Sequence, residues 1–399
     1  MVMLVGIVGK PNCGKSTFFK ALTLSDILIA NYPFATIKPN HGIGYVSLEC
    51  ADKFFSVKCN PRYGFCTNNI RFVPVDIIDV AGLVPGAHTG KGMGNQFLDD
   101  LRQADVLIHV IDISGRTNDK GEPIVGGYDP ANDILFLEEE LDYWYLGILK
   151  KGWEKFARTI SHTGKKPEDE IARQLSGLKV TVDDVKDGIS ELNLSKEVVS
   201  WNDESLLALS RFLRIRTKPM VIAANKIDVK SSIDNYKRIV GQFPHLTIVP
   251  VSAESELALK EASKNNLISY MPGDNAFFIN NPDNLNSTQT KALEFIQTNI
   301  MNTNGGTRVQ DTINTAVFSL LGYIAIFPGS VGKLGDSEGN ILPDCFLMPP
   351  NTTALDFAYK LHTDFGKNFI RATDVKKRIS VGKEHLLKHG DVIEIHYKH

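Results

Sequence analysis

Cysteines are few in this sequence, and no pattern pairs them. Five cysteines occur among 399 residues, with no C-x-x-C pair. Cys59 and Cys66 lie close together, but their spacing lacks the second pair or the histidines typical of a zinc site. This usage favours reduced thiols, and with them a cytoplasmic protein, over a disulfide framework.

Long apolar runs and a strong net charge are also missing. No run approaches the roughly 20 apolar residues of a membrane-spanning helix, and the N-terminus lacks a basic leader. We therefore expect no membrane partner. The formal net charge is −2, so the electrostatic field of the whole protein does not favour binding of nucleic acid. We therefore expect no DNA partner, and any contact with RNA requires a local basic surface.

What is present is an alternation of short β-rich runs with helical patterns, which predicts an α/β fold with a mostly parallel sheet. The runs are short and β-branched, as expected of strands buried on both faces. The predicted strands are Met3–Val8, Phe72–Asp79, Val106–Asp112, Met220–Ala224 and Thr247–Val251.

Changes in pattern predict the domain organisation. A first α/β domain is predicted over residues 1–130 and 217–270, interrupted by a helical insertion at 131–216, where apolar residues recur at helical spacing. A helical connector follows at 271–321. From 322 to 399 the pattern changes to strand, turn, helix, strand and strand, which fits a compact α+β domain.

The segment GKPNCGKS at residues 9–16 is a phosphate-binding loop between a predicted strand and a helix. Such a loop turns its amide hydrogens toward phosphates, while its lysine reaches the β- and γ-phosphates and its serine binds magnesium. The predicted nucleotide-binding residues here are Gly9, Pro11, Asn12, Cys13, Gly14, Lys15, Ser16 and Thr17.

The segment ANKID predicts that the base is guanine. Asp228 would accept hydrogen bonds from the ring N–H and exocyclic amine of guanine, whereas adenine offers no matching pair of donors. Asn225 would tie this loop to the phosphate loop and touch the base, and Lys226 completes the motif. Ser252 and Ala253, after the next strand, would add a backbone N–H to the guanine carbonyl.

Two further segments have the pattern of nucleotide switches. Asp79 ends a strand and would bind magnesium through water, while the Gly82 amide would face the γ-phosphate. Thr36 would join Ser16 as a second protein ligand of magnesium while the γ-phosphate is present.

These four segments together resemble the Obg-related GTPases, and within them the YchF-like branch. The resemblance rests on GKPNCGKST, NYPFATIKPN, DVAGLVPGAHTGKGMGNQFL and ANKID, and residues 342–395 resemble a TGS domain. It implies a translation-factor-class (TRAFAC) GTPase with a β-grasp C-terminal domain and an association with ribosome or RNA. The best-known YchF-like members alter the guanine-reading motif and prefer ATP, but this chain keeps Asn225, Lys226 and Asp228, so we predict GTP and GDP as its ligands, with Mg²⁺.

Leu83 stands where Ras-type GTPases place the glutamine that orients the attacking water, and the resemblance implies a hydrophobic residue there. Turnover then depends on charge stabilisation, with Lys15 and Gly82 in catalytic roles. Asn12 is a candidate to hold a potassium ion, or else it braces the loop. His88 is a candidate to face the water, or else it is a surface histidine. His109, inside a predicted strand, is expected to be a core residue.

The C-terminal segment predicts a partner surface. Residues 360–399 carry nine Lys or Arg against five Asp or Glu, which fits phosphate-backbone contact but also a solvated strand edge. The resulting hypothesis is a slow GTPase that acts as a switch, with the TGS domain facing ribosome or RNA. Two alternatives stay open: a nucleotide-gated RNA- or ribosome-binding scaffold with incidental turnover, and an ATPase of the YchF type.

Overall fold

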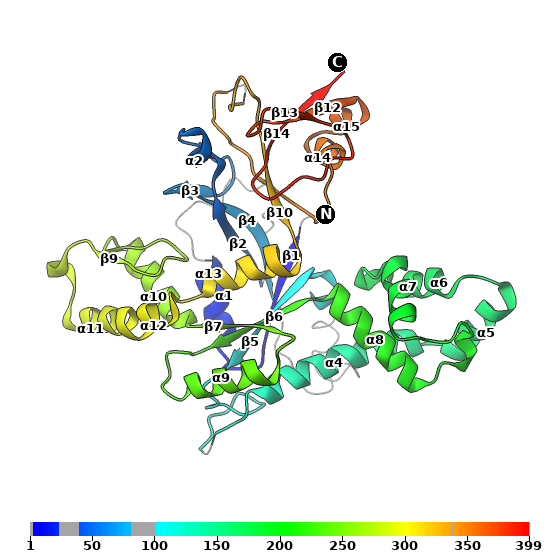
Figure 1. Ribbon diagram of the computed structural model, residues 1–399. Helices are drawn as coiled ribbons and strands as arrows, with labels where there is room; N and C mark the ends of the chain where they lie inside the picture. The colour runs from blue at the N-terminus through cyan, green and yellow to red at the C-terminus, as the bar shows by residue number, and fades with distance from the viewer. Residues whose placement is uncertain (1–2, 24–39, 81–99, 126, 337, 399) are drawn as a thin grey trace. The chain divides into compact units, whose positions relative to one another are not determined.

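The computed structural model describes residues 3–23, 40–80, 100–125, 127–336 and 338–398 (Figure 1). The chain divides into two compact units, one formed by residues 1–21 and 77–312 and the other by residues 22–76 and 313–399. The domain boundaries expected from the sequence stay a prediction. Among the described helices, none has the length and apolar character needed to cross a membrane.

Parallel strands form the centre of the first unit. Strands β1 (Leu4–Val8), β5 (Val106–Asp112), β6 (Met220–Asn225) and β7 (Thr247–Val251) are parallel neighbours in this order. The last residues of β4 (Ile70–Asp79) lie on the other side of β1. Strands β5 and β6 are buried along their whole length, which accounts for their continuous apolar runs. The predicted α/β class with a mostly parallel sheet is confirmed.

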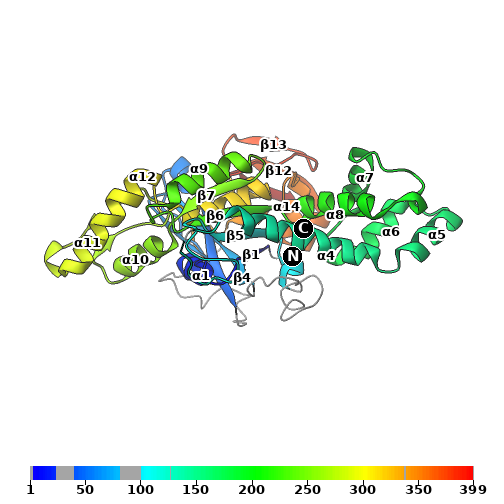
Figure 2. The ribbon, with the colours of Figure 1, turned by 90° about the horizontal axis from the view of Figure 1, so that it is seen from below.

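Helices connect these strands and cover them. Helix α1 (Lys15–Thr23) follows β1, α9 (Ser232–Gln242) connects β6 to β7, and α10 (Ala253–Lys264) follows β7. Beyond α10 come the short strands β8 (Ile268–Ser269) and β9 (Phe278–Ile279), then α11 (Ser287–Ile296), a π-helical turn at Gln297–Met301, and α12 (Asn302–Asn304). In both views α10, α11 and α12 lie on the side of the sheet opposite to the insertion between β5 and β6 (Figures 1 and 2).

That insertion is a group of five helices: α4 (Ala131–Lys150), α5 (Trp153–Thr163), α6 (Pro167–Gln174), α7 (Val182–Glu191) and α8 (Asp203–Thr217). A buried ion pair joins α4 to α8, because Arg214 Nε donates to Asp142 Oδ1 at 2.9 Å. Helix α7 begins with a capping box formed by Thr181 and Asp184.

The second unit contains β2 (His41–Glu49), α2 (Ala51–Phe55), β3 (Phe65–Thr67) and the first part of β4. Its C-terminal portion follows helix α13 (Val309–Asn314) and a π-helical stretch at Thr315–Leu320. Strand β3 forms a hairpin with β4, with Cys66 opposite Arg71. No strand was predicted at β2 or β3.

A five-stranded sheet fills the C-terminal portion, in the order β11-β10-β14-β12-β13. Its elements are β10 (Ile324–Pro328), β11 (Phe346–Met348), α14 (Ala354–Leu361), α15 (Thr363–Lys367), β12 (Phe369–Asp374), β13 (Ile379–Val381) and β14 (Val392–Tyr397). The central pair β10–β14 is parallel and the other pairs are antiparallel. Ile326, Phe357 and Ile393 meet in its core, which gives the predicted β-grasp arrangement.

Candidate functional site

The phosphate-binding loop connects β1 to α1, and two of its residues have a left-handed backbone conformation that turns the chain. Asn12 has φ 59° and Gly14 has φ 93°. A Cβ on Gly14 would lie 2.2 Å from Nδ2 of Asn225, so only glycine allows this approach. Cys13 is fully buried, and burial raises the pKa of its thiol to about 12. The loop therefore contributes a neutral side chain, and no anion, at that point.

Asn225 joins three segments of the predicted site. It ends β6 and is 3% exposed. Its Nδ2 donates to the carbonyl of Cys13 at 3.0 Å, and its Oδ1 accepts from the backbone N–H of Ala253 at 3.1 Å. The link from the guanine-reading motif to the phosphate loop, expected from the sequence, is therefore present in the geometry. One side chain fixes the distance between the two places where a nucleotide would be held.

Lys226 makes a second link through its ammonium. Its Nζ donates to the carbonyl of Asn12 at 2.8 Å and to Asp112 Oδ2 at 2.8 Å. Asp112 is buried at the end of β5 and also accepts from Ser114 and Thr117. Burial opposes ionisation, but the hydrogen bonds from Lys226 and Ser114 outweigh it and lower the pKa of Asp112. The site therefore keeps a buried carboxylate that positions the lysine.

Asp112 and the loop after β5 are site residues that the sequence reasoning missed. The only signal in the sequence was Asp112 at the end of a predicted strand, with Ser114 two residues further on. Further along this loop, Gly121 has φ 78°, and a Cβ there would lie 2.3 Å from the carbonyl oxygen of Pro11. Its own carbonyl accepts from Asn12 Nδ2 at 3.0 Å. The loop thus packs directly against the phosphate-binding loop.

Asp228 lies three residues beyond Asn225 and is half-buried. Its Oδ1 accepts from Ser252 Oγ at 2.9 Å, and Ser252 Oγ is also within 2.8 Å of Ser255 Oγ. This hydroxyl orients the carboxylate of Asp228. Ser252 and Ala253 are predicted to add a backbone N–H to the guanine carbonyl, and that role stays a prediction. In the structure the Ser252 hydroxyl donates to Asp228 and the Ala253 N–H donates to Asn225.

Lys15 and Asp79 converge at the other end of the loop. The Lys15 ammonium forms an ion pair with Asp79 and donates to the carbonyl of Val80 at 2.9 Å. The Val80 N–H donates to the Ile7 carbonyl at 3.0 Å, which anchors the end of β4 beside β1. Ser16 is exposed in the first turn of α1. A hydroxyl and a carboxylate are hard oxygen donors, which is the ligand chemistry that Mg²⁺ prefers.

Several predicted residues lie outside the described part of the chain: Thr36, Gly82, Leu83 and His88. Their assigned roles stay predictions. His109 is described, and it is 1% exposed within β5. Burial lowers its pKa to about 3, so it is a neutral core residue, as expected.

A buried lysine connects the phosphate-binding loop to the helical insertion, and sequence reasoning missed it. Lys10 Nζ lies 2.9 Å from Asp133 Oδ2 in the first turn of α4 and donates to the Thr117 carbonyl at 3.0 Å. The same ammonium lies 4.0 Å from the ring centroid of Tyr128. Because Lys10 and Asp133 are both nearly fully buried, separating them would leave an uncompensated charge.

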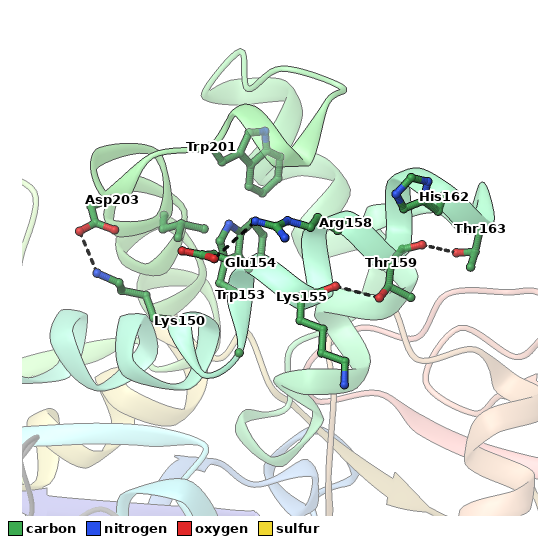
Figure 3. Close-up of a pocket in the computed structure, with 12 residues that line it drawn as sticks. Lys150, Trp153, Glu154, Lys155, Arg158, Thr159, His162, Thr163, Trp201 and Asp203 are labelled. Atoms are coloured by element: carbon green, nitrogen blue, oxygen red, sulfur yellow. Dashed lines mark hydrogen bonds and ion pairs between the residues drawn. The ribbon is translucent and has the colours of Figure 1, made fainter.

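A hollow of about 960 Å³ lies in the helical insertion and not at the phosphate-binding loop (Figure 3). Trp153 and Trp201 are among the residues that line it, and their rings stack on each other with centroids 5.7 Å apart. Lys150 pairs with Asp203 at 2.8 Å on its rim. None of the residues that line it belongs to the nucleotide motifs, so we do not assign the nucleotide to this hollow.

Fold and site together define a P-loop GTPase followed by a TGS domain. Residues 4–135 match the family model described as 50S ribosome-binding GTPase. Residues 223–330 match the one described as Obg-like GTPase YGR210-like, G4 motif-containing domain, and residues 338–397 match the TGS domain.

The chain belongs to the Obg-like, YchF-related family of GTP-binding proteins. An uncharacterized GTP-binding protein of Methanocaldococcus jannaschii is 46% identical over 98% of this chain and 98% of its own length. Another, from Schizosaccharomyces pombe, is 37% identical over 88% of both chains. A ribosome-binding ATPase, YchF, of Buchnera aphidicola is 28% identical over 97% of both.

Solved structures agree with this assignment. A GTP binding protein from Pyrococcus horikoshii superimposes with a TM-score of 0.80 at 37% identity, covering 99% of this chain and all of the other. The YchF GTPase of Schizosaccharomyces pombe superimposes with a TM-score of 0.61 at 24% identity, covering 99% and 97%, and shows the same fold.

Proposed function

We propose that this protein binds GTP and GDP at the loop formed by residues 9–17, hydrolyses GTP slowly to GDP and phosphate, and acts as a nucleotide-dependent switch. The observation that carries the proposal is the position of Asn225, which bonds at once to the phosphate-binding loop and to the loop after β7. Asp228, oriented by Ser252, supports guanine as the base. A carboxylate pairs with both donors of guanine and would lose a hydrogen-bond partner opposite adenine.

The charges at the phosphate end fit a triphosphate. Lys15 forms an ion pair with Asp79, and a bound γ-phosphate would compete with that carboxylate for the ammonium. Asp79 and Ser16 would then hold Mg²⁺, whose charge would offset that of the β- and γ-phosphates. Thr36 and the Gly82 amide complete this proposal from the sequence.

No glutamine is available at Leu83, so hydrolysis must depend on positive charge near the β- and γ-phosphates. We assign Asn12 the role of positioning a potassium ion in the nucleotide complex, and His88 the role of facing the water. Asn12 already donates from Nδ2 to Gly121, so its side-chain oxygen is the atom that would meet the cation. Slow intrinsic turnover is the consequence, because neither residue activates water as a strong base would.

The proposed partner is the ribosome or another RNA, met through the TGS domain. Support comes from the family model described as ribosome-binding and from a relative with that word in its name. The basic residues Lys376, Lys377 and Arg378 form a local cluster on the C-terminal domain. Lys377 is partly neutralised by Asp374, 2.6 Å away, so Lys376 and Arg378 are the stronger candidates for phosphate contact.

The test of the proposed function is competition of GTP, ATP and XTP for a fluorescent GTP analogue, using wild type and Asp228→Asn. Wild type should prefer GTP over ATP. The variant exchanges an acceptor oxygen for a donor, so its GTP affinity should fall about 10- to 100-fold, from the roughly 1.5–3 kcal/mol of a charge-assisted hydrogen bond. XTP, which has a carbonyl in place of the amine, should bind the variant better than GTP does.

Asp234→Asn is the matched control, because this exposed carboxylate lies in the first turn of α9, and it should leave both affinities unchanged. Tighter binding of ATP than GTP by the wild type would refute the role of Asp228 and favour the ATPase alternative. Single-turnover hydrolysis with and without ribosomes then separates a switch from a scaffold, because a switch should be stimulated and a scaffold with incidental turnover should not.

A further inference from the structure

Four potential metal ligands meet in the second unit, and none of them belongs to the nucleotide motifs. They are Cys50, Asp52, Cys59 and Cys66. Each offers one ligand atom, and the four atoms lie within 4.8 Å of one another. Cys50, Asp52 and Cys59 are 2%, 3% and 7% exposed, and Cys66 is half-buried. Buried cysteines are common in proteins, but three thiols that converge with a carboxylate form a ligand set suited to Zn²⁺.

Three separate elements deliver these side chains. Cys50 follows β2 at the N-cap position of α2, and Asp52 lies in the first turn of that helix. The helix ends after one turn at Ser56, which has φ 52°, and the chain turns back to bring Cys59 to the group. Cys66 comes from β3, whose hairpin is tied to the start of α2 because the Cys50 N–H donates to the Asn69 carbonyl at 2.7 Å.

Two of the separations between ligand atoms match the edges of a tetrahedral zinc site, and all of them are within 4.8 Å. The Sγ atoms of Cys50 and Cys59 are 3.7 Å apart, well beyond the roughly 2.05 Å of a disulfide. Cys66 Sγ and Asp52 Oδ2 are 3.6 Å apart. Zn–S bonds of about 2.3 Å and a Zn–O bond of about 2.0 Å at tetrahedral angles give edges of about 3.8 Å and about 3.5 Å respectively.

We propose that Cys50, Asp52, Cys59 and Cys66 bind a structural Zn²⁺ ion. Three thiolates and one carboxylate fill all four positions of a tetrahedron, so no position is left for a substrate or water and the site is not catalytic. Cys59 and Cys66 alone did not indicate a metal site in the sequence. The fold supplies the two missing ligands from the start of α2.

The surroundings favour an anionic, metal-filled group. Asn69 Nδ2 donates to Asp52 Oδ1 at 3.1 Å, which leaves Oδ2 directed at Cys66 and orients the ligand, as outer-shell partners commonly do. Arg71 lies opposite Cys66 in the hairpin register and is 1% exposed. Within the described residues its guanidinium bonds to the carbonyls of Leu342 and Pro343 and forms no ion pair with a carboxylate. Zn²⁺ with four anionic ligands has a net charge of −2, which would offset this buried cation.

The ion would add to the backbone hydrogen bonds that hold the segment between Cys50 and Cys66. The Asn60 N–H donates to the Ile341 carbonyl at 2.8 Å, and the Arg62 N–H donates to the Pro343 carbonyl at 2.9 Å. Between Cys50 and Cys66 the structure has one short helix and the start of a three-residue strand. A single helical turn is not stable by itself in water. Metal binding would therefore contribute directly to the folding of this segment.

Elemental analysis of the full-length protein, purified under reducing conditions without chelator, tests the proposal. Wild type should retain about one zinc ion per chain after gel filtration. Cys59→Ser and Asp52→Ala should retain at least several-fold less. Cys345→Ser is the matched control, because this cysteine is a free thiol of the same unit outside the group, and it should retain the full amount.

A second measurement keeps the test valid if the variants fail to fold. Metal-depleted wild type, refilled with Co²⁺, should develop the intense visible absorption of tetrahedral cobalt thiolate, and Zn²⁺ should abolish it. Added Zn²⁺ should also protect Cys50, Cys59 and Cys66 from alkylation while leaving Cys345 unaffected. Wild type that retains no zinc and shows no such cobalt spectrum would overturn the proposal, as would a Cys50–Cys59 disulfide in the freshly purified protein. None of these results depends on nucleotide binding, so the proposal can fail while the proposed GTPase function stands.

Discussion

Replacing Asn225 with alanine tests whether the nucleotide site is built before the nucleotide arrives. The side chain is 3% exposed and satisfies two backbone groups, the Cys13 carbonyl at 3.0 Å and the Ala253 N–H at 3.1 Å. Each buried backbone group that loses its hydrogen-bond partner lowers the free energy of unfolding by about 1–3 kcal/mol. Asn225→Ala should therefore destabilise the nucleotide-free protein by about 2–6 kcal/mol, toward the lower value if water enters the gap.

Hydrogen exchange and urea unfolding of the nucleotide-free protein measure this effect. The Ala253 amide should exchange at least roughly tenfold faster in the variant, since 1.4 kcal/mol corresponds to a factor of ten. Asn235→Ala is the matched control, because Asn235 is half-buried in the same unit and makes one such bond, to the Ile113 carbonyl at 2.9 Å. Its effect should be about half as large or less. Unchanged Ala253 exchange and unchanged stability would refute the claim that Asn225 joins the loops before the ligand binds.

Two further predictions concern the cation and the pH. GTP turnover should be faster in potassium than in sodium at matched ionic strength, and equal rates would argue against the role of Asn12. Burial lowers the pKa of Lys218 to about 7. Between about pH 7 and pH 10 this lysine is therefore protonated in the unfolded chain but largely deprotonated in the folded one. Because the unfolded chain then binds more protons, the free energy of unfolding should rise with pH in that window. The measurement is urea unfolding at several pH values. Lys218→Met should remove most of the rise in the free energy of unfolding, whereas the control Lys237→Met, at an exposed lysine, should leave the rise unchanged. The same slope in both variants would contradict this assignment.

The parts of the site that form local motifs were predictable from the sequence. The phosphate-binding loop and the ANKID segment each lie directly after a buried strand. In a parallel sheet the carboxyl ends of neighbouring strands lie at one edge, so β1, β5, β6 and β7 bring Asn12, Asp112, Asn225 and Ser252 together. The short β-branched runs that alternate with helical patterns predicted the α/β class and the approximate bounds of β5 and β7.

Residues whose role depends on contacts distant in sequence were not predictable. Gly121 accepts from Asn12, 109 residues before it, and Asp112 accepts from Lys226, 114 residues after it. No spacing pattern in the sequence marks either contact. Strand β2, with the sequence HGIGYVSLE, carries two glycines that weaken its strand signal. The cysteine group has its ligands on three elements, so no motif within one segment reveals it.

The ion pair between Lys10 and Asp133 means that α4 is attached at its base to the residue after Gly9. A helix of 20 residues is about 30 Å long at 1.5 Å per residue. Its far end, Lys150, borders the hollow that Trp153 and Trp201 also line. A small tilt of α4 at its first turn would therefore become a larger displacement at its far end. A tilt of about 5° at the base would carry the tip through about 2.6 Å over that length, close to the width of a water molecule.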